Sequence, residues 1–517
     1  MILLALQSSY VRESMQNSGW EAEIIWEGGD CAMKKWTREE RYRVLKSPDE
    51  IRELHDRMVQ SDYRQTYHIQ SVTGLLNDPN GFVWHDGKWH LFYQWCPWGA
   101  VHGLKYWYQT VSKDLVTWEN VGVCIRPDMD MDNAGAYSGS ALPGKDALCL
   151  FYSGNRRDEN WVRVPNTCTL KLYDNGKVVK LPWPIFGPNP NYTEHQRDPK
   201  IIYNKEMKKY FIILGAQTKD KRGCAIIYRS NELQDGWEFA GELKVPGFEN
   251  FGDMWECPAI ESIGDYDVFL FCPQHLSIEG RGGNIHHNGY LVGKMNWETL
   301  TFEHDNYFHF LDFGFDSYAA ECANNMPTED NAVLVAWMGL PDTSYPTDEE
   351  EWSGCLTLPR ELLMRDRRLI QRPLPALAAL RDGNADLSDG KLPRACEIEI
   401  FCRGDVELRF FAKADGSGGY VFRYDDKKQV ASVDKSGMTQ RYNQELGEKM
   451  DRPLANPLTH LRIFIDRSSI EIFANDGDGV FSSRIFPVEG EERLVFEGQG
   501  TMEIWKLKPA IRDEFVV

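Results

Sequence analysis

The stretch Gly144-Lys-Asp-Ala-Leu148-Cys-Leu-Phe-Tyr-Ser153 joins a turn to a short apolar run, and it decides the fold because the chain repeats it. Gly and Asp favour a turn, and a short run of aromatic and aliphatic residues is typical of a buried β-strand. Comparable runs, each preceded by a turn signal, occur at residues 91–94, 210–215, 268–272 and 332–337. Helical periodicity is missing from this part of the chain, so these runs predict strands.

The repeated runs have a nearly constant spacing. Their central residues are Phe92, Phe151, Phe211, Phe269 and Leu334. Strand-rich units that recur about every 60 residues, five times over, are typical of a five-bladed β-propeller. A large β-sandwich with coincidental spacing is the competing architecture, and four near-equal intervals make it the weaker one.

Strands of a different kind follow the repeats. Residues 397–401, 406–411, 420–424, 461–465, 470–473 and 494–496 alternate apolar and polar side chains with Gly and Asp turns between them, which predicts an antiparallel sandwich. The expected fold class is therefore all-β, a five-bladed β-propeller followed by a C-terminal β-sandwich, with a short helical N-terminal arm. The expected parts are an arm at 1–64, the propeller at 65–372, a linker at 373–390 and the sandwich at 391–517. A short connecting helix is expected at 375–383.

The arm carries one helix signal. Ser47-Pro48-Asp49-Glu50 combines a capping Ser, a Pro at the first helical position and a Glu three residues after the cap. Apolar residues then fall on one face, which predicts a helix near 48–60. Residues 1–32 show no period, Met33 is an alternative start, and the sequence does not decide between them.

Composition excludes several classes of function. The net charge of −20 argues against sequence-independent nucleic-acid binding. No apolar run is long enough to span a membrane, and the N-terminus is a poor signal peptide. The 12 cysteines contain no C-x-x-C pair, so a reducing cytoplasm is expected. No zinc-like ligand spacing, phosphate-binding loop or G-x-S-x-G elbow occurs, and we expect no metal and no cofactor.

Carboxylates recur in register with the blades. The residues that stand about 13 residues before the central ones, at equivalent places in the repeat, are in blade order Asp78, Ser138, Asp198, Glu256 and Glu321. Equivalent positions would line one central funnel, where crowded carboxyl groups raise one another's pKa values. A general acid beside an ionised nucleophile is the arrangement that glycoside hydrolysis needs. Alone, Asn77-Asp-Pro-Asn-Gly81 is an ordinary turn and Arg197-Asp-Pro199 an ordinary ion pair, but their joint register favours catalysis.

The motifs at these positions resemble glycoside hydrolase family 32, the β-fructofuranosidases, and most of all its intracellular bacterial sucrose-6-phosphate hydrolase branch. The resemblance runs from about Tyr67 to the C-terminus. It rests on Asn77-Asp-Pro-Asn-Gly81, Phe92-Tyr-Gln94, Tyr137-Ser-Gly-Ser140, Arg197-Asp-Pro199, Glu256-Cys257, Trp337-Met-Gly-Leu-Pro-Asp342, Leu356-Thr-Leu-Pro-Arg-Glu361 and Asp466-Arg-Ser-Ser-Ile-Glu-Ile-Phe473.

The resemblance implies a retaining mechanism with a covalent fructosyl-enzyme. It implies that Asp78 is the nucleophile, that Glu256 is the acid and then the base, and that Asp198 binds fructose hydroxyls and stabilises the transition state. Retention requires the Asp78 and Glu256 carboxyl groups to lie about 5 to 5.5 Å apart. The other positions that it implies in substrate binding are Asn77, Gln94, Tyr137, Ser138 and Arg197.

The chain departs from the family pattern at three places. Leu75-Leu76 precedes the first motif, where many members have Trp-Met. His102 stands where secreted and plant-type members have a Trp, which is typical of the intracellular branch and leaves Trp98 as another aromatic candidate for stacking on the substrate. Glu321 stands where Gln is expected, and a further carboxylate there would alter the pKa of the acid or bind a sugar hydroxyl.

The expected function is hydrolysis of terminal β-fructofuranosidic bonds in sucrose or sucrose 6-phosphate. A fructosyltransferase or a fructo-oligosaccharide-preferring fructosidase is the alternative, and a non-catalytic sugar-binding propeller is remote because all three carboxylates are present. The expected partner is a small sugar, with no nucleic acid and no membrane. The sequence leaves open phosphate preference, to which His102, Lys105 and Arg281 are candidate contributors, and also a homo-oligomer and the role of the sandwich.

Overall fold

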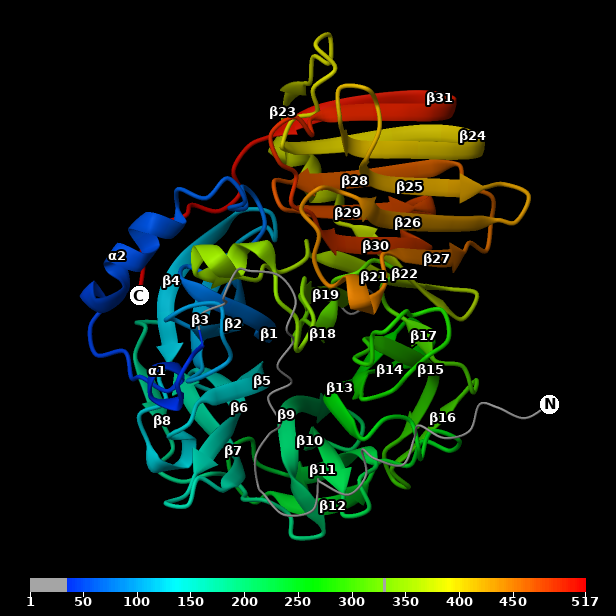
Figure 1. Cartoon of the computed structure of the whole chain (residues 1–517). Helices are drawn as coiled ribbons and strands as arrows, with labels where there is room; N and C mark the ends of the chain where they lie inside the picture. The colour runs from blue at the N-terminus through cyan, green and yellow to red at the C-terminus, as the bar shows by residue number, and fades with distance from the viewer. Residues whose placement is uncertain (1–34, 329–331) are drawn as a thin grey trace, which may run out of the picture. The chain divides into compact units, whose positions relative to one another are not determined.

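Five sheets follow one another along the chain and surround a common centre (Figure 1). The computed structural model describes residues 35–328 and 332–517, so the expectations for residues 1–32, for a start at Met33 and for the turn at Glu329-Asp330 lie outside the described residues. Each sheet is one predicted repeat, and the prediction of an all-β fold with a five-bladed propeller is confirmed.

The blades are antiparallel meanders that run in chain order. Blade one consists of β1 (Gly74–His85), β2 (Lys88–Cys96), β3 (Tyr106–Ser112) and β4 (Trp118–Ile125). Blade two consists of β5 (Ala136–Pro143), β6 (Leu148–Arg157), β7 (Arg163–Leu172) and β8 (Val178–Lys180). Blade three consists of β9 (Tyr192–Asn204), β10 (Lys209–Thr218), β11 (Gly223–Ser230) and β12 (Glu238–Glu242).

The last two blades complete the ring. Blade four consists of β13 (Met254–Ile263), β14 (Tyr266–Gln274), β15 (Gly289–Asn296), β16 (Thr301–His304) and the short β17 (His309–Phe310). Blade five consists of β18 (Tyr318–Cys322), β19 (Ala332–Trp337), β21 (Arg360–Arg365) and β22 (Arg368–Pro373). The two-residue strand β20 (Trp352–Ser353) pairs in parallel with β1, so blade five is tied to blade one. The short 3-10 helices η1 (Asp130–Asp132) and η2 (Pro346–Glu350) lie in connections.

The repeated apolar runs explain how the blades pack. Every run forms the second strand of its blade: β2, β6, β10, β14 and β19. Both faces of such a strand are buried because a neighbouring blade covers each one. Phe92 and Trp107 of blade one, for example, share a cluster with Leu150 and Tyr152 of blade two, and none of these four side chains is exposed.

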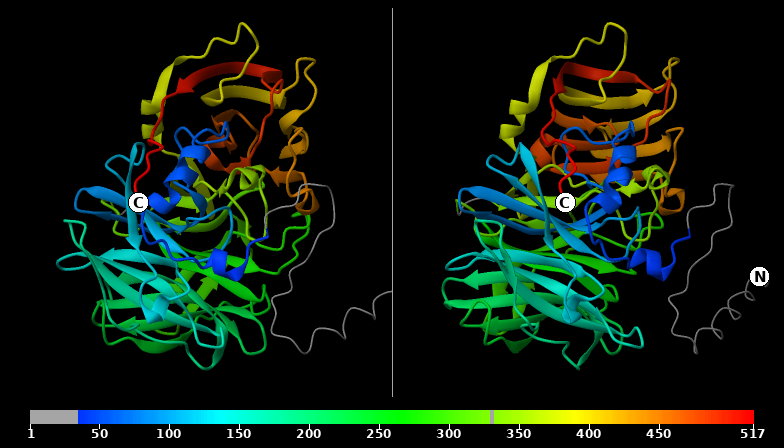
Figure 2. Two further views of the ribbon diagram at one scale, coloured as in Figure 1. Left: turned by 60° about the vertical axis from the view of Figure 1, so that its left-hand side comes forward. Right: turned by 90° about the vertical axis from the view of Figure 1, so that its left-hand side faces the viewer.

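The sandwich follows the propeller, and Figure 2 shows both from two further sides. Its strands are β23 (Arg381–Asn384), β24 (Ala395–Ala412), β25 (Gly419–Asp425), β26 (Val430–Gly437), β27 (Lys449–Pro453), β28 (His460–Asp466), β29 (Ser469–Ala474), β30 (Gly479–Arg484) and β31 (Arg493–Leu507). The first half of β24 pairs with β28 and the second half with β25, so β24 joins the two strand groups. Phe422 and Phe481, one from each group, lie in one buried cluster, which makes the arrangement a sandwich.

The expected helix at 375–383 is only partly present. A 3-10 helix, η3, covers Pro375–Leu380, and Arg381–Asn384 is the strand β23. The helix prediction was wrong for its last residues because Arg381 pairs with Leu507 of the sandwich, and this long-range pairing overrides local helix propensity. Two further 3-10 turns, η4 (Gln444–Leu446) and η5 (Asn475–Gly477), lie in sandwich loops.

Two helices precede the first blade, α1 (Arg38–Arg41) and α2 (Asp49–Met58). The backbone N–H of Ser47 donates to the Glu50 carboxylate (3.1 Å) and the Asp49 N–H donates to the Ser47 hydroxyl (3.3 Å). These two bonds are the predicted capping chemistry. Leu54 and Met58 pack on Trp352. No helix within 35–328 and 332–517 is long and apolar enough to cross a membrane.

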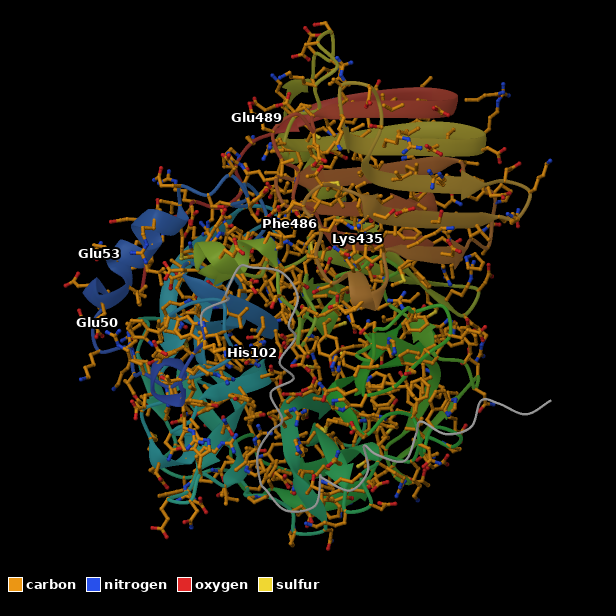
Figure 3. The ribbon with its side chains drawn as sticks, viewed as in Figure 1. Glu50, Glu53, His102, Lys435, Phe486 and Glu489 are labelled. Carbon is orange, nitrogen blue, oxygen red and sulfur yellow. The ribbon has the colours of Figure 1, made fainter. Side chains whose placement is uncertain are left out.

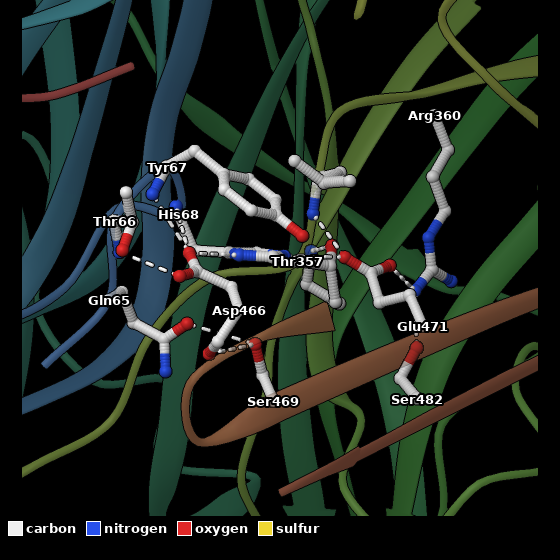
Figure 4. Close-up of polar contacts among 12 residues, drawn as sticks. Gln65, Thr66, Tyr67, His68, Thr357, Arg360, Asp466, Ser469, Glu471 and Ser482 are labelled. Atoms are coloured by element: carbon white, nitrogen blue, oxygen red, sulfur yellow. Dashed lines mark hydrogen bonds and ion pairs between the residues drawn. The ribbon is translucent and has the colours of Figure 1, made fainter. Parts of the chain in front are cut away.

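A buried polar network joins the sandwich to the segment that leads into β1 (Figure 4). The Asp466 carboxylate accepts three backbone N–H groups, those of Thr66, Tyr67 and His68, at 2.7 to 3.0 Å. The His68 ring lies between Asp466 (2.9 Å) and Glu471 (3.0 Å). Burial alone would lower the pKa of His68, but the hydrogen bonds with these two carboxylates raise it to about 9.

Arg360 extends the same network into blade five. Its guanidinium donates to Glu471 (2.6 Å) and to Asp312 (3.1 Å), and none of its side chain is exposed. Buried charges are tolerated when they are paired and hydrogen-bonded. The network therefore holds the first blade, the last blade and the sandwich to one another.

Candidate active site

In every blade, the innermost strand has a register shift, a β-bulge, at an equivalent position along the strand. Pairing with the second strand shifts register between Leu76 and Pro79, Tyr137 and Gly139, Arg197 and Lys200, Glu256 and Ala259, and Tyr318 and Glu321. A β-bulge bends a strand and turns a side chain toward a new direction. The residues that the sequence placed in register are the ones at these bulges, so the backbone aims them at the centre of the ring.

Asp78 is fixed by hydrogen-bond donors on both of its carboxylate oxygens. Ser138 (2.5 Å) and Gln94 (3.0 Å) donate to Oδ2, and Asn77 (3.0 Å) donates to Oδ1. The Gln94 amide also donates to the Ser138 hydroxyl. Behind them the buried ammonium of Lys105 donates to the Asn77 side chain (2.6 Å). These contacts place three predicted site residues, Asn77, Gln94 and Ser138, around the Asp78 carboxylate and hold its side chain in one rotamer.

Asp198 lies on β9 with a left-handed backbone (φ 66°). Few non-glycine residues adopt this conformation, and it is found where the surrounding structure enforces it. The Ser153 hydroxyl accepts the Asp198 N–H (2.8 Å), and the Cys257 N–H donates to the Asp198 carboxylate (3.1 Å). Cys257, the residue after Glu256, also has a positive φ (47°). Two strained positions thus bring β9 and β13 together at the carboxyl groups.

Glu256 is held by three side chains. The Arg197 guanidinium pairs with Oε1 (2.7 Å), while Gln274 and Tyr318 each donate to Oε2 at 2.7 Å. Arg197 also donates to the Gln274 side-chain oxygen (3.2 Å). The Glu256 side chain is 17% exposed, so this carboxylate keeps contact with solvent in the funnel.

The three carboxyl groups titrate as one cluster. Burial, then the charge of Glu256, raises the pKa of Asp198 to about 7. Burial likewise raises the pKa of Asp78, opposed by the Ser138 hydrogen bond. Burial would also raise the pKa of Glu256, but the charge of Arg197 and the hydrogen bonds from Tyr318 and Arg197 bring it below its ordinary value. Asp198 is therefore the member of the cluster that exchanges its proton near pH 7, beside an ionised Glu256.

Glu321 is buried deeper. The Phe82 N–H donates to its Oε2 (3.4 Å), and its Oε1 has no hydrogen-bond partner among the described residues. Burial, opposed by the charge of Lys200, raises the pKa of Glu321 to about 8, so its carboxyl group is neutral at pH 7. Asp198, Ser138 and Glu321 line one small cavity of about 30 Å³. A cavity of this size has room for roughly two water molecules. Glu321 therefore lies behind the carboxylate cluster.

The two predicted aromatic candidates differ in their surroundings. The Trp98 indole N–H donates to the Arg43 carbonyl (2.7 Å), and the Arg43 guanidinium lies 3.9 Å from the ring centroid, so Trp98 packs under the N-terminal segment. His102 keeps an exposed surface and lies near the centre of the propeller (Figure 3). Its ring lies 6.3 Å from that of Trp337, and desolvation by the surrounding protein, then the charge of Lys105, lowers its pKa well below the usual range. Tyr137, the remaining candidate, is half-buried beside Ser138.

Sequence reasoning missed several neighbours of the carboxylate cluster, namely Ser153, Gln274, His286 and Tyr318, and it named Lys105 only for phosphate preference. Tyr318 stands at the bulge of its strand as Asn77 and Ser138 stand at theirs, so the register of the repeats could have found it. Gln274 ends β14, the strand after Glu256, and only knowledge of the pairing places it beside Glu256. No cluster of three His, Cys, Asp or Glu side chains in the described ranges is arranged to hold a metal ion.

The inner strands of this propeller bring together two carboxylates, Asp78 held by hydrogen-bond donors and Glu256 paired with Arg197. This is the arrangement of a glycoside hydrolase that works with two carboxyl groups. The comparisons name the family. The model of the glycosyl hydrolases family 32 N-terminal domain matches residues 68–373, and that of the family 32 C-terminal domain matches residues 384–509. The chain belongs to glycosyl hydrolases family 32, which confirms the resemblance read from its motifs.

Individual relatives agree with this assignment. The chain is 38% identical over 474 residues to a sucrose-6-phosphate hydrolase of Staphylococcus xylosus, and the match covers 88% of this chain and 94% of the relative. A sucrose-6-phosphate hydrolase structure from Lactobacillus gasseri matches with a TM-score of 0.87 and 34% identity, over 92% of this chain and 100% of the other. A Bombyx mori family 32 β-fructofuranosidase variant in complex with sucrose matches with a TM-score of 0.77 and 28% identity, over 90% and 99%.

Proposed function

We propose that this chain is a retaining β-fructofuranosidase that releases fructose from sucrose 6-phosphate and from sucrose. The observation that carries the proposal is the carboxylate cluster, in which Asp78, Asp198 and Glu256 project from bulges on three inner strands into surroundings that differ in charge. The similar proteins named as sucrose-6-phosphate hydrolases, and the sucrose complex of a structural neighbour, support the choice of substrate.

Asp78 is suited to act as the nucleophile. Ser138, Gln94 and Asn77 donate to it, and these contacts hold the carboxylate in one orientation before substrate arrives. Preorganisation of this kind removes the entropic cost of finding the reactive geometry. In the proposed first step, a carboxylate oxygen of Asp78 bonds to the fructosyl C2 as the bond from C2 to the leaving oxygen breaks.

Glu256 is assigned the acid and base roles. It protonates the departing glucosyl oxygen. Once water has replaced that group, Glu256 removes a proton from the water that attacks C2, and the bond between C2 and the Asp78 carboxylate breaks. In the free site Arg197 keeps Glu256 ionised. A bound sugar excludes water from the funnel and stabilises the neutral acid, so we propose that the proton on Asp198 is redistributed within the cluster when substrate binds. The mechanism requires carboxyl groups of Asp78 and Glu256 about 5 to 5.5 Å apart.

Asp198 is assigned to the sugar hydroxyls. Once it is ionised, its negative charge lies beside the ring that becomes oxocarbenium-like, where it stabilises developing positive charge. The Cys257 N–H and the left-handed backbone at Asp198 fix its position. His102, Trp98, Tyr137 and Glu321 stay candidates for substrate contact, of which His102 is exposed in the funnel.

Transfer of fructose to a second sugar is the competing outcome of the same intermediate. A cytoplasmic site of action is part of the proposal. It is supported by the free thiol state of all 11 cysteines that the structure describes, because a reducing compartment keeps thiols free.

The test is a comparison of kcat/KM for sucrose, sucrose 6-phosphate, kestose and inulin, with product analysis at high sucrose. We expect free fructose from both sucrose substrates and the highest kcat/KM for one of them. Accumulation of trisaccharide with little free fructose would establish a transferase instead, and absence of turnover on all four would refute the proposed function.

A further inference from the structure

Two buried cationic side chains lie away from the carboxylates, where the loop between β14 and β15 meets the sandwich. The backbone N–H of Gly283 donates to the Leu446 carbonyl (3.2 Å), and a Cβ at Gly282 would lie only 2.1 Å from that oxygen. The two backbones are therefore in direct contact. Beside this contact is a cavity lined by Arg281, Asn284, Gly314, Phe315, Leu340, Lys435, Asn443, Leu446, Gly447 and Met450.

Two cations in this cavity lack a counter-ion. Among the residues that the structure describes, no carboxylate lies within ion-pair distance of Arg281 or Lys435. The nearest acidic influences are Asp312 on Arg281 and Asp316 on Lys435. Both are committed elsewhere, since Asp312 pairs with Arg360 and Asp316 accepts the Tyr345 and Tyr442 hydroxyls.

The unpaired charges are also poorly solvated. Burial lowers the pKa of Arg281 to about 10 and lowers that of Lys435. Only 5% of Lys435 is exposed, and it lies where the sandwich faces the propeller (Figure 3). Arg281 stacks 4.5 Å from the centroid of Phe310, and its buried Nε has no hydrogen-bond partner among residues 35–328 and 332–517. A contact with an aromatic face compensates only part of the cost of burying a charge.

Amide donors complete the lining. The buried Nδ2 of Asn443 has no hydrogen-bond partner in the part of the chain that the structure describes. The Asn284 side-chain oxygen accepts the His286 N–H (2.9 Å), which leaves its amide N–H groups for another acceptor. A guanidinium, an ammonium and two amides are donors that match the oxygens of a phosphoryl group.

We propose that this cavity, which we call the seam pocket, binds a phosphate-type oxyanion between the propeller and the sandwich. The empty space, its open mouth included, is about 270 Å³, and the enclosed part is about 10 Å³, which is room for about one water molecule. An oxyanion would therefore place one oxygen in the enclosed part and the others at the open mouth, and a whole sugar does not fit, since sites for larger ligands are roomier. The ligand is either free phosphate or the phosphate group of an ester whose sugar stays outside.

Occupancy of the seam pocket would act on the active site through one loop. That loop begins after Gln274, which donates to Glu256, and it contains His286, one of the groups that contribute to the low pKa of Glu256. An oxyanion held by Arg281 on the loop and by Lys435 on the sandwich would fix the loop, and with it both neighbours of the acid.

The test is equilibrium dialysis of the full chain against radiolabelled inorganic phosphate at constant ionic strength, without substrate. We expect one phosphate per chain, at least tenfold weaker binding in Arg281→Gln, and unchanged binding in the control Lys294→Gln, whose side chain is 61% exposed.

Asn443→Asp is the second variant. The backbone at Asn443 (φ 46°) is one that Asn and Asp both adopt, and the new carboxylate would act as the missing counter-ion. It should abolish phosphate binding and raise Tm in phosphate-free buffer by about 1 to 2 °C.

Absence of phosphate binding in the wild type, or equal binding in Arg281→Gln and Lys294→Gln, would overturn the inference. Kinetics identify the source of the oxyanion. If the substrate supplies it, Arg281→Gln raises KM for sucrose 6-phosphate and leaves KM for sucrose unchanged; if free phosphate is the ligand, neither KM changes in phosphate-free buffer. The dialysis needs no catalysis, so it remains decisive even if the proposed function fails.

Discussion

Replacing His68 by Gln tests whether the sandwich anchors the segment that leads into the first inner strand. The ring of His68 lies between two fully buried carboxylates, and its pKa in the folded protein is about 9, against about 6.5 for an ordinary His. Gln has a similar polar end but carries no charge. The substitution therefore leaves Asp466 and Glu471 in place with one fewer positive charge between them.

The magnitude follows from the pKa difference. Each pKa unit corresponds to about 1.4 kcal/mol, so protonation of His68 contributes about 3 kcal/mol to the free energy of unfolding. Because the folded-state pKa is the higher one, this contribution is complete below about pH 6.5 and is lost as the pH rises through about 9. For about 480 residues the entropy of unfolding is on the order of 1 kcal/mol per kelvin, so His68→Gln should lower Tm by about 3 °C at pH 6.

The assay is differential scanning calorimetry of the full chain at pH 6 and at pH 9.5. We expect the Tm difference between wild type and His68→Gln to shrink to about 1 °C or less at the higher pH. His85→Gln is the matched control, because His85 has only one carboxylate neighbour, Asp174 at 3.8 Å, among the described residues. A Tm difference that is the same at both pH values, or one that His85→Gln reproduces, would refute a charged His68.

Three further predictions concern the funnel. Asp78→Asn, Asp198→Asn and Glu256→Gln should each fold with a wild-type circular dichroism spectrum and lose about 10³-fold or more in kcat; near-wild-type turnover in any of them would remove its assigned role. The alkaline limb of kcat/KM should lie near pH 7, where the carboxylate cluster loses its shared proton. Arg197→Gln should move this limb to higher pH, because the charge that lowers the pKa of Glu256 is gone. A limb that stays in place would contradict the role of Arg197 in lowering that pKa. Glu321 has a folded-state pKa of about 8, so it lowers the stability of the fold increasingly as the pH rises above 4.5. Glu321→Gln should therefore raise Tm by about 3 °C at pH 7 and by little at pH 4.5. A rise in Tm of equal size at both pH values would show that the charge of Glu321 is not the reason.

The fold was predictable because its signal is periodic. A run such as Leu148-Cys-Leu-Phe-Tyr is apolar on both faces, and the only way to bury both is to place a blade on each side. The same period gave the depth of Asp78, Asp198 and Glu256, since each lies a nearly fixed number of residues before such a run. The position of a residue along its repeat could thus be predicted from the sequence.

Contacts between strands, whether of one blade or of two, could not be predicted in this way. Gln274 reaches Glu256 only because β14 pairs with β13, and Tyr318 reaches it across a blade boundary. The network of His68, Asp466 and Arg360 joins segments that are distant in the sequence, and no local pattern marks such a pairing. Trp98 was one candidate for stacking on the substrate, and the sequence could not show that Arg43, before the first blade, lies over its ring.

The covalent fructosyl-enzyme is the central claim of the mechanism, and mass spectrometry can detect it directly. Glu256→Gln leaves Asp78 free to attack but removes the group that activates water, so a substrate with a good leaving group, such as an activated aryl β-fructofuranoside, should load the enzyme faster than water unloads it. Intact-protein mass spectrometry should then show the chain heavier by one anhydrofructosyl unit, and peptide mapping should place that mass on Asp78. Release of the aryl alcohol without any added mass on the protein, or with the mass on another carboxylate, would contradict the mechanism.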